Sequence, residues 1–307
     1  MGLQKLNRSN WVFFLLDLAQ TIDLDPNQSI IMKKILAVIF VLISAYSFGQ
    51  PVIGLQMGSV GKHAKADLPG TLKKLNEWGV RELEGGLPAG MEVAQYLKLL
   101  KENNLTLVAI GSNFDSLATN PQKIADHAKA LGAKQVICYW IPHHGDDFTI
   151  DDAKKGVEVF NKAGEVLQRN GLALGYHAHG YEFRPYEGGT LFDYIAKNLD
   201  KRYANFQMDV FWIKESGTDP VALLNKYPDR FISMHLKDRL KGTPDSITGH
   251  ADVDKANVVL GMGDVGIEAI FKTGHRAGIK HYFIEDESSR QWEQVPQSVA
   301  YLKSIKF

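Results

Sequence analysis

Short apolar segments rich in β-branched residues recur along the chain, and longer stretches with helical periodicity separate them. The apolar segments predict strands, and the stretches whose apolar residues recur every three or four positions predict amphipathic helices. The eight predicted strands span residues 52–57, 80–84, 106–110, 135–140, 172–177, 205–209, 231–235 and 280–285. Helical spacing is clearest over residues 68–78, 93–100, 124–131, 157–167 and 221–227.

Several predicted helices end at a glycine that is followed at once by the next strand, as at Gly79, Gly132 and Gly171. Strands that alternate with helices pair in parallel through right-handed crossovers. Eight such units in about 250 residues predict one α/β domain, a (β/α)8 TIM barrel. A doubly wound open sheet is the alternative, but residues 57–61 lack the glycine fingerprint expected after its first strand. The connection over residues 236–265 is unusually long, which is typical of lids and binding loops.

The segment 32–49 has the features of a cleaved signal peptide. Two lysines precede an apolar run at residues 35–43, and small residues lead up to a cleavage point near Gly49. The run is shorter than the about 20 apolar residues of a membrane-spanning helix. Because a signal peptide normally begins a chain, we predict that residues 1–31 are an upstream extension and residues 50–307 the folded domain. We therefore expect an exported, periplasmic protein that keeps no membrane contact after cleavage.

Composition narrows the range of partners. The 307 residues carry 35 Lys and Arg against 35 Asp and Glu, so the formal net charge is zero. This balance gives no electrostatic footprint for nucleic acid or for an anionic membrane. Cys138 is the one cysteine, which excludes an intramolecular disulfide and a cysteine-rich zinc module. A homo-oligomer is left open.

Ionisable side chains follow the predicted strands at their carboxyl ends, where a TIM barrel carries its active site. Six of the eight strands end in or beside such a side chain, namely Glu84, the pair His143 and His144 after Trp140, His177 with His179, Asp209, His235 and Glu285. Histidines and carboxylates from successive strands can build an open site for a divalent metal. Three or four such ligands would leave room for two adjacent oxygens of a substrate.

Each of these residues also has a structural interpretation. Asp209 could cap a helix, His235 could be a hydrogen-bonded core histidine, and Glu285 lies in an acidic segment that could be solvated. Glu84 could bind loop amides beside two glycines, and residues 143–144 could be a surface pair. These alternatives stay open on the sequence alone.

Four motifs stand in order on the predicted strands. They are Tyr-His-Ala-His-Gly-Tyr-Glu-Phe at 176–183, Gln-Met-Asp-Val-Phe-Trp at 207–212, Met-His-Leu-Lys-Asp at 234–238 and Ile-Glu-Asp-Glu at 284–287. Together they resemble the sugar phosphate isomerase/epimerase family of xylose-isomerase-like TIM barrels, within the AP-endonuclease-2-like superfamily. The resemblance extends over residues 52–307, which is the whole predicted domain.

The resemblance implies one divalent metal, either manganese, cobalt, magnesium or zinc, held by His177, Asp209, His235 and Glu285. The ketose 3-epimerases of the family carry glutamate where this chain has His177, and only one of His177 and His179 is expected to be a ligand. A histidine there is more similar to inosose dehydratases and 3-keto-glycoside lyases, in which a proton beside a ketone is removed and a β-oxygen leaves. The endonuclease IV branch needs a richer ligand set and a DNA-binding surface, which this sequence does not indicate.

The chemistry that these relatives share is enolisation, in which a base removes a proton beside a carbonyl and a metal stabilises the enediolate. The candidate catalytic residues are the bases Glu285, His143 and His179, and Lys237, which could steady an oxyanion. The candidate substrate-binding residues are Glu84, Trp140, Trp212 and Glu182, with Phe114 as a further stacking residue. We therefore expect a metal-dependent sugar isomerase or epimerase that acts on a ketose or keto-sugar. The alternatives are a lyase or dehydratase of 3-keto-glycosides or inosose-like compounds, and a non-catalytic carbohydrate-binding barrel.

Overall fold

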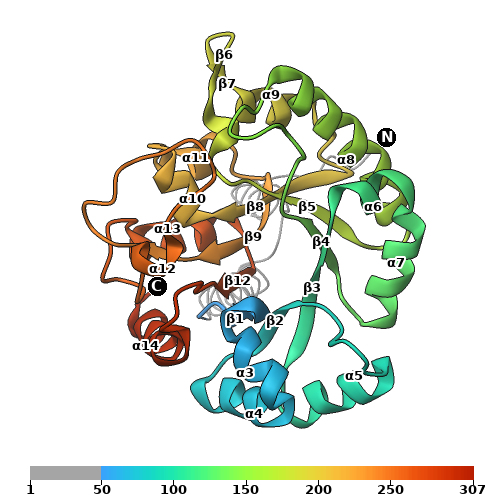
Figure 1. Ribbon diagram of the computed structural model, residues 1–307, viewed down its shortest axis with the longest axis vertical. Coiled ribbons are helices and arrows are strands. Elements are labelled where there is room, and N and C mark those ends of the chain that lie inside the picture. The colour runs from blue at the N-terminus through green and yellow to red at the C-terminus, as the bar shows by residue number, and fades with distance from the viewer. Residues whose placement is uncertain (1–49) are drawn as a thin grey trace, which may run out of the picture. The chain divides into compact units, whose positions relative to one another are not determined.

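The computed structural model describes residues 50–307, so the predicted upstream extension and signal peptide lie outside the described residues. In the unit Pro51–Phe307, eight parallel strands close into a barrel surrounded by helices (Figure 1). The barrel strands are β1 (Ile53–Gln56), β2 (Glu82–Gly85), β3 (Thr106–Ser112), β4 (Gln135–Cys138), β5 (Ala173–His177), β8 (Ala204–Asp209), β9 (Phe231–Leu236) and β12 (His281–Ile284). They follow one another around the barrel as β1-β12-β9-β8-β5-β4-β3-β2, which confirms the predicted TIM barrel.

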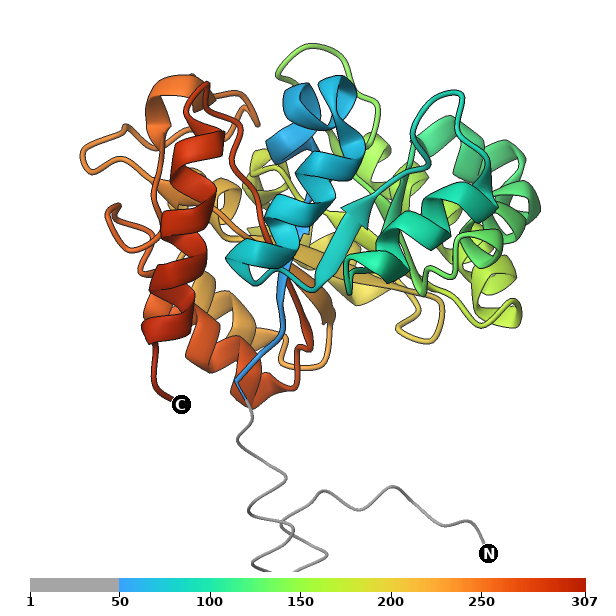
Figure 2. The same cartoon turned by 90° about the horizontal axis from the view of Figure 1, so that it is seen from below.

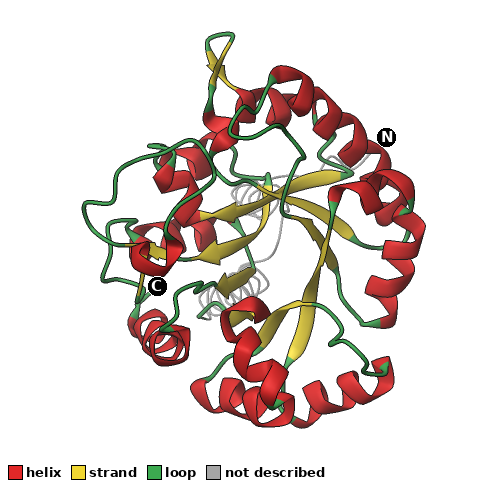
Figure 3. Ribbon diagram, in the orientation of Figure 1, coloured by secondary structure: helices red, strands yellow, loops and turns green. Residues whose placement is uncertain are grey.

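Helices cover the outside of the barrel, as Figure 3 shows for the red helices around the yellow strands. The α-helices are α3 (Gly61–Ala66), α4 (Leu68–Trp78), α5 (Val93–Glu102), α6 (Phe114–Thr119), α7 (Pro121–Ala130), α8 (Ile150–Arg169), α9 (Leu191–Asn198), α10 (Val210–Glu215), α11 (Pro220–Lys226), α12 (Val253–Ala256), α13 (Ile267–Ala277) and α14 (Gln291–Ser304). Residues 50–307 also contain two short 3-10 helices, η1 (Met57–Val60) and η2 (Tyr181–Phe183). Within residues 50–307, no helix has the length and apolar character needed to cross a membrane.

Local sequence signals set where several helices begin and end. The Asp67 carboxylate accepts a hydrogen bond from the Gly70 amide at 3.0 Å and so caps the start of α4. At the other end of α4, Gly79 has a φ of 101°, a left-handed conformation that a residue with a side chain rarely adopts. Thr149 and Asp152 form a reciprocal capping box at the start of α8. The bounds of α4 match the predicted segment 68–78, whereas α8 begins seven residues before the predicted segment 157–167, at its capping box.

The interior of the barrel changes from apolar to polar along the strands. Val108, Ile137 and Phe283 belong to a small buried apolar cluster that is separate from the main core. Gly54 leaves room for the Phe283 ring, because a Cβ atom at Gly54 would lie 2.6 Å from it. Towards the carboxyl ends of the strands, buried polar side chains take over, namely Glu84, His177, Gln207, Asp209 and His235. The fold therefore gathers polar groups at the end where TIM barrels carry their chemistry.

The carboxyl ends of the strands meet at one face of the barrel. Figure 2 shows the chain entering β1 at the lower face of the view, where α14 also ends, so the strands run towards the upper face. The long connection after β9 contains β10 (Asp238–Arg239), which pairs with β11 (Asn257–Val258), and a further hairpin joins β6 (Pro185–Tyr186) to β7 (Gly189–Thr190). The buried Arg239 guanidinium binds the Glu215 and Asp245 carboxylates at 3.1 and 2.8 Å. The predicted binding loop therefore has secondary structure and an ion network of its own.

Candidate metal centre

Three of the four predicted metal ligands converge at the polar end of the barrel. His177 ends β5, Asp209 ends β8 and His235 lies near the end of β9, and these strands are neighbours. One ligand atom from each residue lies within 4.8 Å of the other two, and all three side chains are buried. Glu285 follows β12, and its Oε2 atom lies 3.3 Å from Nδ1 of His235.

Two buried atoms of this group lack a hydrogen-bond partner among residues 50–307. The Asp209 Oδ1 atom accepts hydrogen bonds from the Phe211 and Trp212 amides at 2.8 and 3.1 Å, so Asp209 does cap α10. Its Oδ2 atom has no partner, and neither does Nδ1 of His235. An unsatisfied buried polar group costs about 1–3 kcal/mol, and a charged one costs more. A cation among these atoms would satisfy both, so the residues fit a divalent metal of the kind that binds imidazole and carboxylate together.

Lys237 and Glu285 form a charged pair beside the three ligands. The Lys237 ammonium is completely buried, lies 3.6 Å from Oε2 of Glu285 and also pairs with Glu287. Burial alone would raise the pKa of Glu285, but the positive charges of His235 and Lys237 hold it well below its usual value. Burial likewise opposes charge on Lys237, but nearby carboxylates outweigh this effect and raise its pKa. Both side chains are therefore charged at neutral pH.

Aromatic rings form a wall next to the charged pair and the ligands. The Trp140 ring stacks on His143 with centroids 4.6 Å apart, and it meets His179 edge to face at 5.5 Å. His179 also contacts the rings of His177 and Trp212, at 4.6 and 5.6 Å. Burial lowers the pKa of His179 well below its usual value, and in the described part of the chain its Nδ1 atom has no hydrogen-bond partner. His179 therefore presents a neutral ring nitrogen with a free lone pair or hydrogen.

Glu84 and Glu182, two of the predicted substrate-binding residues, are buried and bonded within the protein. Glu84 is completely buried beneath the ligands and bonds to the Tyr139 hydroxyl at 2.9 Å and to Nε2 of His235 at 2.6 Å. Glu182 is also completely buried, where it accepts hydrogen bonds from the amides of residues 179 and 180 and from the Tyr176 hydroxyl. Both carboxylates are thus bonded to the protein itself.

Gln207 is a part of the centre that the sequence reasoning did not single out. Its amide oxygen lies 2.7 Å from Nδ1 of His177, and its amide nitrogen lies 2.5 Å from Oε2 of Glu84. A signal was present in the sequence, because Gln207 precedes Asp209 by two positions and residues two apart in a strand face the same side.

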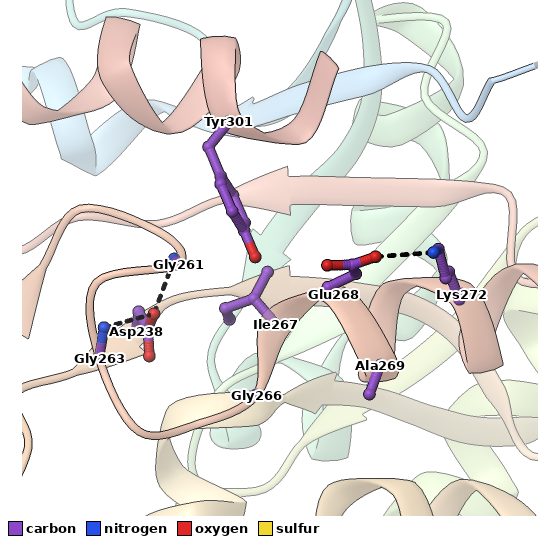
Figure 4. A pocket seen from close by; sticks show the side chains of 9 residues that line it. All are labelled: Asp238, Gly261, Gly263, Gly266, Ile267, Glu268, Ala269, Lys272 and Tyr301. Carbon is purple, nitrogen blue, oxygen red and sulfur yellow. Dashed lines mark hydrogen bonds and ion pairs between the residues drawn. The ribbon is translucent and has the colours of Figure 1, made fainter. Parts of the chain in front are cut away.

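One hollow shares a residue with this end of the barrel, and another lies apart from it. One of about 390 Å³ is bounded by Tyr139, Trp140 and Phe114, and it shares the Trp140 ring with the aromatic wall. A second hollow, of about 490 Å³, lies between α13 and α14 (Figure 4). In Figure 4 the Tyr301 side chain points into it and Asp238 binds the amides of Gly261 and Gly263. The four predicted ligands are not among its lining residues.

The profile described as the xylose isomerase-like TIM barrel matches residues 72–305, so the chain belongs to this family. Two sugar phosphate isomerase/epimerases from Parabacteroides distasonis have similar structures. One is 26% identical, with 83% of this chain and 94% of that chain covered and a TM-score of 0.71. The other is 27% identical, with 83% and 98% covered and a TM-score of 0.68. The predicted family resemblance is thereby confirmed.

A third similar structure is that of the IOLI protein with a bound zinc atom. It is 12% identical, with 82% of this chain and 95% of that chain covered and a TM-score of 0.64. At this identity the likeness is one of fold alone. A search of curated proteins found no significant match.

Proposed function

We propose that the protein is a divalent-metal-dependent isomerase or epimerase of a ketose or keto-sugar, which moves a proton on the carbon beside a carbonyl group. One observation carries the proposal: the buried group of His177, Asp209 and His235, with its unpartnered carboxylate oxygen and ring nitrogen, lies next to the charged pair Glu285 and Lys237. Membership of the xylose isomerase-like family and the likeness to sugar phosphate isomerase/epimerases support it.

We assign the metal to His177, Asp209 and His235, with Glu285 as a fourth ligand. When bound, a divalent cation acts as a Lewis acid and stabilises negative charge on a substrate oxygen by several kcal/mol. Glu285 is also our candidate base, because its carboxylate is ionised and lies beside the ligands and the Lys237 ammonium. A positioned general base contributes about 10²- to 10⁴-fold to the rate.

Lys237 is our candidate for stabilising the substrate oxygen that becomes negative as the proton leaves. Its ammonium group lies 4.9 Å from the Phe211 ring centroid and 5.1 Å from that of Trp212, so the charge is held in place by aromatic faces. A fixed positive charge in a buried site needs no reorganisation during the reaction, which makes it an effective stabiliser.

The proton must return to carbon for an isomerisation to balance, either at the neighbouring carbon or on the opposite face of the same carbon. We assign this second acid–base role to His179, whose unpartnered Nδ1 lies in a ring 4.6 Å from that of His177. His143 is the other candidate. Its Nδ1 lies 2.7 Å from the Ile141 carbonyl oxygen, to which it can only donate, so its unpartnered Nε2 is the acceptor.

A metal-dependent lyase or dehydratase is the second candidate function. The observation that favours it is that β5 ends in His177, where the ketose 3-epimerases of the family carry a glutamate. In an elimination the base takes the proton, the carbon electron pair forms a double bond, and the β-carbon–oxygen bond breaks. The proton that Glu285 takes from carbon then passes to the leaving oxygen, either directly or through the neighbouring imidazole of His179 or His143.

The test is to incubate the metal-loaded protein in D2O with free ketoses and, separately, with 3-keto-glucosides. Nuclear magnetic resonance of the products should show an isomer with deuterium at the carbon beside the carbonyl. Release of the second sugar or alcohol from a 3-keto-glucoside would instead establish the lyase. Sugar binding without turnover of either class would overturn both and favour the non-catalytic carbohydrate-binding barrel.

A further inference from the structure

The two histidines of the metal centre are connected to a single buried carboxylate, that of Glu84. Nε2 of His235 lies 2.6 Å from Oε1 of Glu84, and the Tyr139 hydroxyl donates to the same oxygen. The other oxygen accepts a hydrogen bond from the Gln207 amide nitrogen at 2.5 Å. Because Glu84 is completely buried, water does not compete for these bonds.

Gln207 connects Glu84 to His177 through hydrogen bonds. Its amide nitrogen has two hydrogens, and these are donated to Glu84 and to the Ser233 hydroxyl, which lies at 3.0 Å. Its amide oxygen can only accept, and it lies 2.7 Å from Nδ1 of His177. Nδ1 of His177 therefore carries the hydrogen, and the lone pair of the neutral ring is on Nε2, 3.6 Å from Oδ2 of Asp209.

The same reasoning applies to His235. An ionised carboxylate only accepts, so Nε2 of His235 carries the hydrogen that bonds to Glu84. In the neutral form of the ring, which is the form that binds a metal, the lone pair is then on Nδ1, which faces Asp209 and Glu285 at 4.0 and 3.3 Å. Both lone pairs thus point to the place where the candidate ligand atoms converge.

We propose that Glu84 is a positioning residue that fixes the tautomers of both histidine ligands, acting on His235 directly and on His177 through Gln207. Hydrogen bonds of this kind behind metal-binding histidines set the ring orientation and the affinity for metal. The inference rests on the metal centre of the proposed function, but it concerns a residue that would touch neither metal nor substrate.

The substitution Glu84→Gln tests the connection because it keeps the size of the side chain and adds two hydrogens on one side. If the new amide nitrogen faces Gln207, the Gln207 amide must turn over and present its nitrogen to His177. His177 must then accept at Nδ1 and carry its hydrogen on Nε2, where the metal should bind. If the new nitrogen faces His235, that ring must carry its hydrogen on Nδ1 instead. Either orientation blocks one of the two histidines.

The experiment measures two quantities on purified protein. Isothermal titration with Co²⁺ and Zn²⁺ gives the affinity, and ¹⁵N-edited resonance of histidine-labelled, Zn²⁺-loaded protein, in which the ligand rings are neutral, gives the tautomers. In Glu84→Gln we expect an affinity about 10- to 100-fold lower and one histidine tautomer reversed. Glu82→Gln is the matched control, because Glu82 lies on the same strand and bonds Nδ1 of His281 at 2.8 Å, away from the centre. It should leave the metal affinity unchanged.

Gln207→Met is the second variant and decides the question if Glu84→Gln does not fold. It removes the connection to His177 but keeps the contact between Glu84 and His235, so His177 alone should show mixed tautomers and the affinity should fall. In the double variant, the fold-loss of metal affinity should be smaller than the product of the two single losses, because both substitutions act on one chain of hydrogen bonds. Wild-type affinity and tautomers in both variants would overturn this inference and leave the proposed function standing. A wild-type protein that binds neither metal would overturn the proposed function itself.

Discussion

The two carboxylate oxygens of Asp209 have different surroundings, and one substitution can separate their contributions. Its Oδ1 atom caps α10 through the amides of Phe211 and Trp212, whereas its Oδ2 atom is buried without a hydrogen-bond partner among the described residues. The substitution Asp209→Asn keeps a cap oxygen and puts an amide group in place of the unpartnered atom. That group would face Nε2 of His177, which lies 3.6 Å from Oδ2 and can accept a hydrogen bond.

Without metal, we expect Asp209→Asn to be more stable than the wild type at pH 8. Burial raises the pKa of Asp209 to about 7, so at pH 8 the wild type carries an ionised carboxylate with one unpaired oxygen. Relief of that unsatisfied group should stabilise the variant by about 1–3 kcal/mol. The direction of the pH dependence of stability follows from the difference between the folded and unfolded pKa of Asp209. The folded pKa lies above the unfolded value of about 3.9, so this contribution to wild-type stability is present at low pH and lost as the pH rises through about 7.

With metal, the order should reverse. A ligand at 100 times its dissociation constant stabilises the protein that binds it by about 2.7 kcal/mol. The wild type should gain this amount, whereas the variant has lost the charged ligand and should gain little. Asp209→Ala is the matched control, because it also loses the helix cap and should be less stable than Asp209→Asn by about 1 kcal/mol in both conditions.

The assay is urea denaturation at pH 8, once in a chelator and once with Co²⁺, with the free energy of unfolding as the readout. The reasoning would be refuted by an asparagine variant that is less stable than the wild type in chelator and gains as much stability from Co²⁺. Such a result would show that Asp209 is only a helix cap, which is the structural alternative that the sequence left open.

Three further predictions concern other parts of the chain. Glu285→Gln should abolish deuterium incorporation from D2O, and full exchange in a variant that still binds metal would exclude Glu285 as the base. Burial raises the pKa of Glu182 to about 7. Glu182 therefore stabilises the fold at low pH, and this contribution is lost as the pH rises from the pKa of the unfolded chain through neutrality. Glu182→Gln cannot titrate, and between pH 5 and 8 its stability relative to wild type should therefore improve by about 2–3 kcal/mol in parallel denaturation series; parallel pH curves would contradict this. Finally, peptide mass mapping of protein from the native host should find a mature start near Gln50, and recovery of residues 1–31 would contradict export.

The order and the type of the elements could be predicted from the sequence because they depend on short-range properties. An alternation of β-branched runs with helical periodicity, and glycines such as Gly79 that end helices, act over a few residues. Parallel pairing then follows from connectivity, and the carboxyl ends of all strands must meet at one face. For that reason His177, Asp209 and His235 could be named as neighbours, although 58 positions separate the first from the last. The signal peptide stays a prediction.

The roles of Glu84 and Gln207 could only be decided by the tertiary structure. Glu84 ends a predicted strand just as His235 does, and nothing in the local sequence distinguishes a residue open to substrate from one behind the ligands. The bond between Glu84 and Gln207 joins residues 123 positions apart, and the bond between Glu84 and His235 spans 151 positions across the barrel. Which side chains meet at such separations depends on barrel closure, strand register and the depth of each residue along its strand. Sequence periodicity gives the face on which a side chain lies, but only the closed barrel places its atoms within hydrogen-bonding distance of a partner from a distant strand.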